Sequence, residues 1–173
     1  MLPETVREAI FTTIPREALG KTAAIEWADL ADIPAALRRH PIVVSLRISS
    51  DVVDGRWTSA SRLAGIEHGT DDQAHTHDQY RLATLTIDVH ARTRSGSISG
   101  VDLIDAYMDG LQIWALAALP NYVNVAADNG TLDLSYLEMN AERRQTSFLL
   151  RYHQAAARTL PNINDIGAEI ITE

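Results

Sequence analysis

Two histidines in an acidic stretch are the residues of this chain best placed to bind a metal ion. His75 and His77 lie two positions apart, so both imidazole rings fall on the same side of an extended chain. Divalent metals accept imidazole and carboxylate ligands, and further candidates lie nearby in the sequence: His68, Asp71, Asp72 and Asp78. A solvated loop explains the same residues, and we prefer it because exposed loops often have this spacing by chance. We therefore predict no cofactor and no metal, and keep His75 and His77 as the candidate ligands.

Four arginines form a second group of residues that could bind a partner. Arg92 and Arg94 end a predicted strand on its polar face, while Arg143 and Arg144 begin the last predicted strand. If these strands are neighbours, the guanidinium groups form a basic patch that suits acidic side chains of a partner or weak contact with DNA. A solvated sheet face with salt bridges is the alternative.

Sequence motifs of common enzymes are absent from the chain. It contains no G-x-S-x-G, no H-E-x-x-H and no phosphate-binding glycine loop. It also contains no cysteine, which excludes disulfides, thiolate metal ligands and cysteine nucleophiles. We therefore predict that the protein is not an enzyme.

Composition narrows the class further. A chain of 173 residues with 46% hydrophobic content can bury one ordinary core. The net charge of −8 argues against a broad basic surface that holds nucleic acid. Since no segment has the pattern of a signal peptide or a membrane span, we expect the protein to act in an aqueous interior without a membrane.

The clearest elements lie in the second half of the chain. Apolar and polar residues alternate over Arg81–Thr93, which predicts a half-buried antiparallel strand. A turn at Gly96–Gly100 leads into a helix from about Ser99 to Leu119, which Pro120 ends. The tripeptide Asp128-Asn129-Gly130 predicts a hairpin, and its two strands are Tyr122–Ala127 and Thr131–Met139.

The remaining segments complete an α+β fold. Helices are predicted over Pro3–Phe11, in part of Lys21–Pro34 from the spacing of Trp27, Leu30 and Ile33, and from Pro34 to Arg39. Ile42–Ser50 is predicted to be the first strand, Asp51–Asp78 a long loop, and Arg144–His153 a further strand that closes the compact part.

We therefore predict a mostly antiparallel four-stranded sheet with one long helix packed on a face. Residues 1–160 form a single domain, with N-terminal helices in 1–40 and the sheet and helix core in 41–155, while 161–173 form an extended C-terminal tail that docks on another surface.

The long helix carries more apolar surface than one sheet requires. One apolar stripe suits the sheet, and a second consists of Leu103, Tyr107 and Trp114. The second stripe packs either beneath the N-terminal helices or against another subunit. With the four arginines, these three residues are our candidates for an oligomer or partner interface.

The order of these elements resembles the tail terminator or tail completion proteins, the head–tail joining proteins of long-tailed viruses and phages. The resemblance covers roughly residues 35–155 and rests on four segments: Tyr80–Arg92, Val101–Leu119, Asp133–Tyr136 and Arg143–Tyr152. It implies a structural virion protein that assembles as a ring, most often a hexamer, and that ends the tail tube and joins it to the head.

The same resemblance implies partners and a location. The partners are the tail tube protein, the head connector or stopper protein, and genomic DNA that passes through the lumen without specific binding. The location is the virion, at the head–tail junction or in the tail, with assembly in the host cytoplasm. Two other functions remain open: a small oligomeric binding module of cellular origin, and a metal-dependent enzyme that uses His75 and His77.

Overall fold

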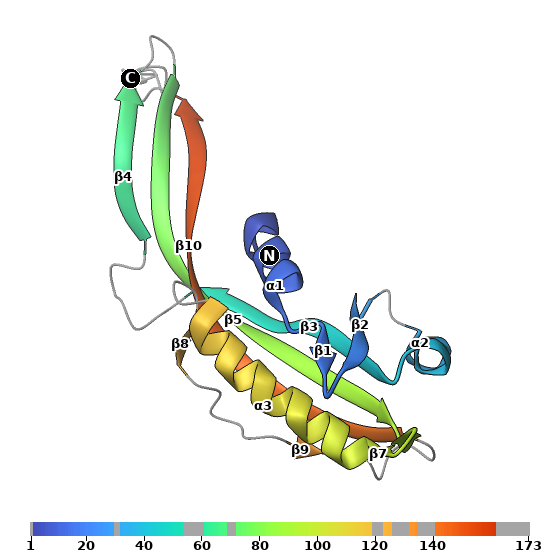
Figure 1. The fold of residues 1–173 in the computed structure, drawn as a ribbon. Helices are drawn as coiled ribbons and strands as arrows, with labels where there is room; N and C mark the ends of the chain where they lie inside the picture. Colours follow the sequence, from blue (N-terminus) through green and yellow to red (C-terminus); the bar gives the residue numbers. More distant parts are fainter. Residues whose placement is uncertain are drawn as a thin grey trace, which may run out of the picture. The chain divides into compact units, whose positions relative to one another are not determined.

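The computed structural model describes residues 2–29, 32–53, 61–68, 72–118, 123–125, 132–134 and 141–161, and these form a mixed α+β fold, as the sequence predicts (Figure 1). Its elements in chain order are α1 (Glu4–Thr13), β1 (Glu17–Ala18), β2 (Lys21–Trp27), α2 (Ile33–Arg39), β3 (Ile42–Val53), β4 (Ser61–His68), β5 (Asp72–Arg92), β6 (Arg94–Ser95), β7 (Ile98–Ser99), α3 (Gly100–Ala118), β8 (Val123–Val125), β9 (Leu132–Asp133) and β10 (Ala141–Pro161).

The chain divides into two compact units. The first comprises Met1–Val52 and Leu82–Arg151, and the second comprises Val53–Arg81 and Tyr152–Glu173. Strands β3, β5 and β10 contribute residues to both units. Of the predicted tail, only Pro161 is described, as the last residue of β10, and residues 162–173 lie outside the described residues.

The sheet is larger than the four-stranded sheet that we predicted. Its strands follow the order β1-β2-β3-β5-β10-β8, with β4 beside β5 and β9 beside β10. Strand β2 pairs with β3 in parallel, while β1 and β2, β10 and β8, and β10 and β9 pair antiparallel. The parallel pair requires a crossover, and α2 lies in the connection between β2 and β3.

The helix predicted within Lys21–Pro34 is wrong, because its described residues before Ile33 form strand β2 and a turn, and helix α2 begins only at Ile33. Lys21–Trp27 is strand β2, in which Ala23 and Ile25 are buried while their neighbours are more accessible. This period of two is the pattern of a strand. The spacing of Trp27 and Ile33 suggested one helix, whereas they belong to different elements.

Helix α3 and strand β5 form the centre of the core. Apolar residues of the strand and of the helix are fully buried: Ala83, Leu85, Ile87, Val89, Ala91, Leu103, Ile104 and Leu111. At the start of the helix, the Ser99 hydroxyl accepts from the Asp102 N–H at 3.1 Å and donates to its carboxylate at 2.7 Å. This reciprocal cap fixes the helix start where the sequence predicts it.

The polar face of β5 is also buried, although we predicted a half-buried strand. Thr86, Asp88 and His90 are each less than a tenth exposed. The Thr86 hydroxyl lies 3.1 Å from that of Ser49 on β3 and 3.3 Å from that of Ser147 on β10. These contacts link the polar faces of three neighbouring strands.

In the second unit, most of the predicted Asp51–Asp78 loop consists of strands. Strand β4 pairs antiparallel with the first part of β5, from Ser61 opposite Gln79 to His68 opposite Gln73. The register shifts between Leu63 and Gly65, so Ala64 is an extra residue without a partner in the ladder. These strands were not predicted from the sequence because both are polar and neither has a long apolar run.

The predicted hairpin is described only in part. Strands β8 and β9 lie within its two predicted arms, and each pairs with β10, while residues 126–131 of the turn lie outside the described residues.

Two glycines of α3 provide a test of the packing at its start. A Cβ atom at Gly100 would lie 2.3 Å from the Arg92 carbonyl oxygen, whereas one at Gly110 would meet nothing within 4 Å. We expect Gly100→Ala to lower the free energy of unfolding by about 1–3 kcal/mol. Gly110→Ala should raise it by about 0.5–1 kcal/mol, because alanine favours the helix. Urea denaturation measures both, and a stabilising Gly100→Ala would contradict the close approach.

Candidate functional site

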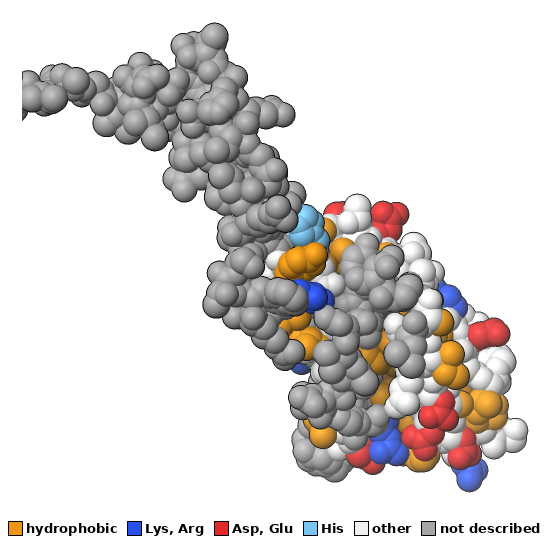
Figure 2. Space-filling model, turned by 90° about the vertical axis from the view of Figure 1, so that its left-hand side faces the viewer, with side chains coloured by type: hydrophobic (Ala, Val, Ile, Leu, Met, Phe, Trp, Pro, Cys, Tyr) orange, Lys and Arg blue, Asp and Glu red, His pale blue; other side chains and the backbone are white. Residues whose placement is uncertain are grey.

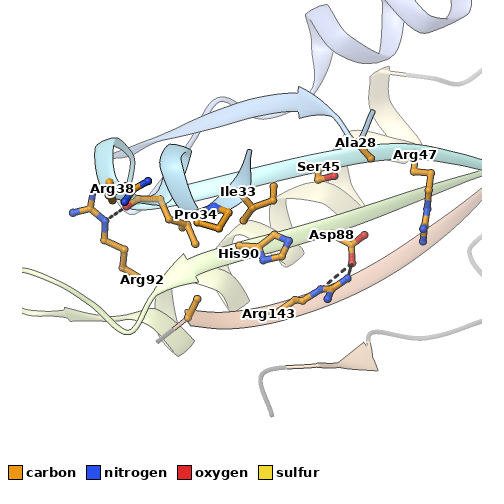
Figure 3. A pocket seen from close by; sticks show the side chains of 12 residues that line it. Ala28, Ile33, Pro34, Arg38, Ser45, Arg47, Asp88, His90, Arg92 and Arg143 are labelled. Carbon is orange, nitrogen blue, oxygen red and sulfur yellow. Dashed lines mark hydrogen bonds and ion pairs between the residues drawn. The ribbon is translucent and has the colours of Figure 1, made fainter. Parts of the chain in front are cut away.

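A cavity of about 990 Å³ lies in the first unit, on the face of the sheet opposite α3 (Figure 3). Residues of α2, β3, β5 and β10 line it, with one residue that follows β2: Ala28, Ile33, Pro34, Leu37, Arg38, Ser45, Arg47, Asp88, His90, Arg92, Ala141 and Arg143. Its volume is at the upper end of the range for small-molecule sites.

Helix α2 supplies the apolar wall of the cavity. The Asp32 carboxylate caps its start by accepting from the Ala35 N–H at 3.1 Å, and Pro34 lies in the first turn, where its missing N–H costs nothing. The short helix thereby places Ile33, Pro34 and Leu37 over the polar row of β5.

The floor of the cavity contains a buried carboxylate. One oxygen of Asp88 accepts from Arg143 Nη2 at 3.0 Å, from Arg143 Nε at 3.3 Å and from Gln145 Nε2 at 2.9 Å. Both donors come from β10, the neighbour of β5. The ion pair and the amide contact offset the hydration that the carboxylate loses on burial.

Three other arginines of the cavity have no acidic partner among the described residues. Arg92 is half-buried and donates through Nε to the Leu37 carbonyl, while Arg38 and Arg47 are exposed. Within the part of the chain that the structure describes, none of these three forms an ion pair. Four arginines against one aspartate leave the lining with a formal charge of 4 − 1 = +3, although the whole chain carries −8.

This positive charge is local. On the face shown in Figure 2, acidic and basic side chains of the described residues lie side by side, with hydrophobic side chains among them. The lining of the cavity, with its formal charge of +3 and the apolar residues of α2, suits an anionic ligand with an apolar portion.

The predicted patch of four arginines is not observed. Arg92 and Arg143 do line one cavity, but Arg94 lies exposed on β6, and Arg144 pairs with Asp133 at 2.7 Å and Asp105 of α3 at 3.6 Å. The reason is geometric, because successive residues of a strand point to opposite faces, so Arg143 and Arg144 cannot share one.

Leu103, Tyr107 and Trp114 are buried within the chain, so the intramolecular alternative accounts for the second stripe. The Tyr107 hydroxyl donates to the Pro15 carbonyl at 2.6 Å, and Trp114 Nε1 donates to the Thr13 hydroxyl at 2.9 Å. Burial raises the pKa of Tyr107 well above its usual value, and the charge of Arg16 offsets only part of this rise. The end of α1 and the residues after it therefore cover this side of α3.

The metal hypothesis receives no support from the described residues. His75 and His77 lie on β5, opposite Ile66 and Leu63 of β4, and their side chains are outside the described part. Among the side chains that the structure does describe, no group of three potential ligands could hold a metal ion.

Sequence reasoning missed five polar residues of the cavity: Arg38, Ser45, Arg47, Asp88 and His90. The alternation in β3 and β5 placed four of them on polar strand faces. The alternation does not reveal where α2 lies. The polar row lines a cavity only because this helix lies over it.

Comparison of the sequence with known protein families and with curated proteins finds no matching family model and no matching protein. None of the helices in the described part is both long and apolar enough to span a membrane.

Replacement of Trp114 tests whether its burial is intramolecular. Trp114 is 6% exposed and meets Phe148 edge to face, with ring centroids 6.2 Å apart, whereas its neighbour Ile113 is 70% exposed. Trp114→Ala should lower the free energy of unfolding by about 3–5 kcal/mol, and Ile113→Ala should change it by no more than about 0.5 kcal/mol. Denaturation at several protein concentrations measures this, and a loss that vanished on dilution would instead place Trp114 between subunits.

The ion pair in the cavity floor gives a second test. Asp88→Ala leaves Arg143 partly buried without its carboxylate, and we expect the free energy of unfolding to fall by about 3 kcal/mol. Asp133→Ala removes the exposed partner of Arg144 and should cost less than about 1 kcal/mol. Similar losses of unfolding free energy for both variants would show that the Asp88–Arg143 pair contributes no more to stability than the exposed Asp133–Arg144 pair.

Proposed function

We propose that this protein is a structural virion subunit that assembles as a hexameric ring at the head–tail junction, where it ends the tail tube and joins it to the head. The observation that carries the proposal is the second unit, built largely from continuations of core strands. Strands β5 and β10 are each 21 residues long and belong to both units. Small groups of strands bury little apolar surface alone, so they commonly gain stability by packing against a partner.

The outer strand of this unit supports assembly. Among the described strands, β4 pairs only with β5, so the backbone groups on its other edge have no ladder partner there. Such an edge can accept a strand from another chain. A ring subunit needs contact surfaces of this kind and needs no catalytic group.

The charge of the chain is compatible with this role. A net charge of −8 favours passage of DNA over retention, because retention requires many cations along the phosphate backbone. The proposed partners are the tail tube protein, the head connector or stopper protein, and DNA that is not bound specifically.

A small oligomeric binding module is the second candidate, and the 990 Å³ cavity favours it. A binding module would use that cavity for a ligand and would have no wide lumen. The two candidates therefore differ in the shape of the assembled particle.

Solution mass and negative-stain imaging of the full chain, at low and high salt, test the ring. We expect rings with an open lumen, and a compact closed oligomer would favour the binding module.

Since Ala64 is already unpaired in the β4–β5 ladder, Ala64→Pro should leave that pairing intact while blocking the outer edge. The variant should shift rings to monomers with little change in melting temperature.

The control is Ala64→Ser, which keeps the backbone N–H and should form rings like the unmodified chain. Rings that persist in Ala64→Pro would show that the β4 edge is not a subunit contact.

A further inference from the structure

Positive charge lies at both ends of the cavity, with an apolar middle. Arg92 reaches the carbonyl of Leu37 beside Arg38, while Arg47 and the Arg143–Asp88 pair lie toward the other end (Figure 3). Between them, Ile33 and Pro34 of α2 lie over His90. Asp88 and Arg92 are four residues apart on one strand, which corresponds to about 13 Å between their Cα atoms.

The charged groups at the two ends are not equally satisfied. Asp88 offsets the charge of Arg143, whereas Arg38, Arg47 and the half-buried Arg92 form no ion pair among the described residues. A guanidinium group that has lost part of its hydration gains most from a carboxylate, which it binds in a planar, bidentate geometry. The cavity, whose lining includes Asp88 and Arg92 four residues apart on β5, therefore suits two carboxylates joined by an apolar segment.

One segment of this chain has that pattern. Residues 162–173, which lie outside the described residues, contain three acidic residues and no basic one: Asp165, Glu169 and Glu173. They are spaced by four, so in an extended segment neighbouring carboxylates lie on one side, about 13 Å apart. Ile166 and Ala168 separate the first two, and Ile170 and Ile171 separate the last two.

We propose that the cavity is a docking site for the acidic C-terminal segment, residues 165–173, of a second copy of this chain. The acidic segment complements the formal charge of +3 in the cavity lining, and the isoleucines match its apolar wall. Two successive carboxylates reach the two basic ends, and the residues between them contact α2. The proposal rests on the self-association proposed above, because the segment comes from another subunit.

A labelled peptide of residues 162–173 tests the docking. The receptor is the full chain with Asp165→Asn, Glu169→Gln and Glu173→Gln, so that its own segments compete weakly. Fluorescence anisotropy should show saturable binding that weakens with added salt. The additional pair Arg38→Glu and Arg47→Glu should weaken binding about tenfold or more. Both residues are exposed, so these changes leave the core intact.

Two matched controls give the test its specificity. Arg94→Glu reverses an exposed arginine outside the cavity and should leave binding unchanged. A peptide of identical composition with its three acidic residues adjacent should bind about tenfold more weakly, because it cannot reach both ends. Absence of binding, equal loss with Arg94→Glu, or equal binding of the rearranged peptide would each overturn the proposal.

Cysteine trapping tests whether the segment comes from a second copy. The chain has no cysteine, so Ala141→Cys in the cavity lining and Ile166→Cys can be placed in separate chains and mixed. Mild oxidation should give a disulfide-linked dimer of the two variants, and Thr12→Cys, exposed on α1, should not replace Ala141→Cys. Equal trapping by Thr12→Cys would contradict docking in the cavity.

Rings that form while the peptide fails to bind would overturn this inference alone, whereas peptide binding without rings would count against the proposed function alone.

Discussion

The Asp88–Arg143 ion pair joins β5 to β10 on the sheet face that lies opposite α3. Asp88 is 6% exposed, so its carboxylate has lost hydration that nearby donors must replace. Arg143 and Gln145 do so from one neighbouring strand. Because this pair offsets the desolvation cost of burying the polar row, α2 can lie over that face and enclose a cavity rather than leave a solvated surface.

Arg92 connects that cavity to the opposite layer of the fold. Its N–H donates to the Pro41 carbonyl at 3.1 Å, its side chain donates to Leu37, and its carbonyl lies against Gly100 at the start of α3. The next carbonyl, of Thr93, accepts from the Gly100 N–H at 2.8 Å. The end of α2, the end of β5 and the start of α3 are therefore fixed around one residue.

Elements with strong local patterns were predictable from the sequence, and elements defined by distant contacts were not. The alternation in β5 and the capped start of α3 are properties of short segments. By contrast, Lys21–Trp27 becomes a strand through parallel pairing with β3, which no local pattern encodes. The burial of Tyr107 and Trp114 depends on Pro15 and Thr13, about a hundred positions earlier in the chain. The cavity likewise requires α2, β3, β5 and β10 together.

The shared strands of the two units also limit how this sequence can change in length. Since β5 is one continuous strand of 21 residues that belongs to both units, an insertion or deletion of a single residue within it would exchange the two faces for every position on one side of the change. Such a change would move Asp88 and His90 toward α3 or displace the partners of β4. Variation in length is therefore expected in the connections, while β5 tolerates substitutions far better than gaps.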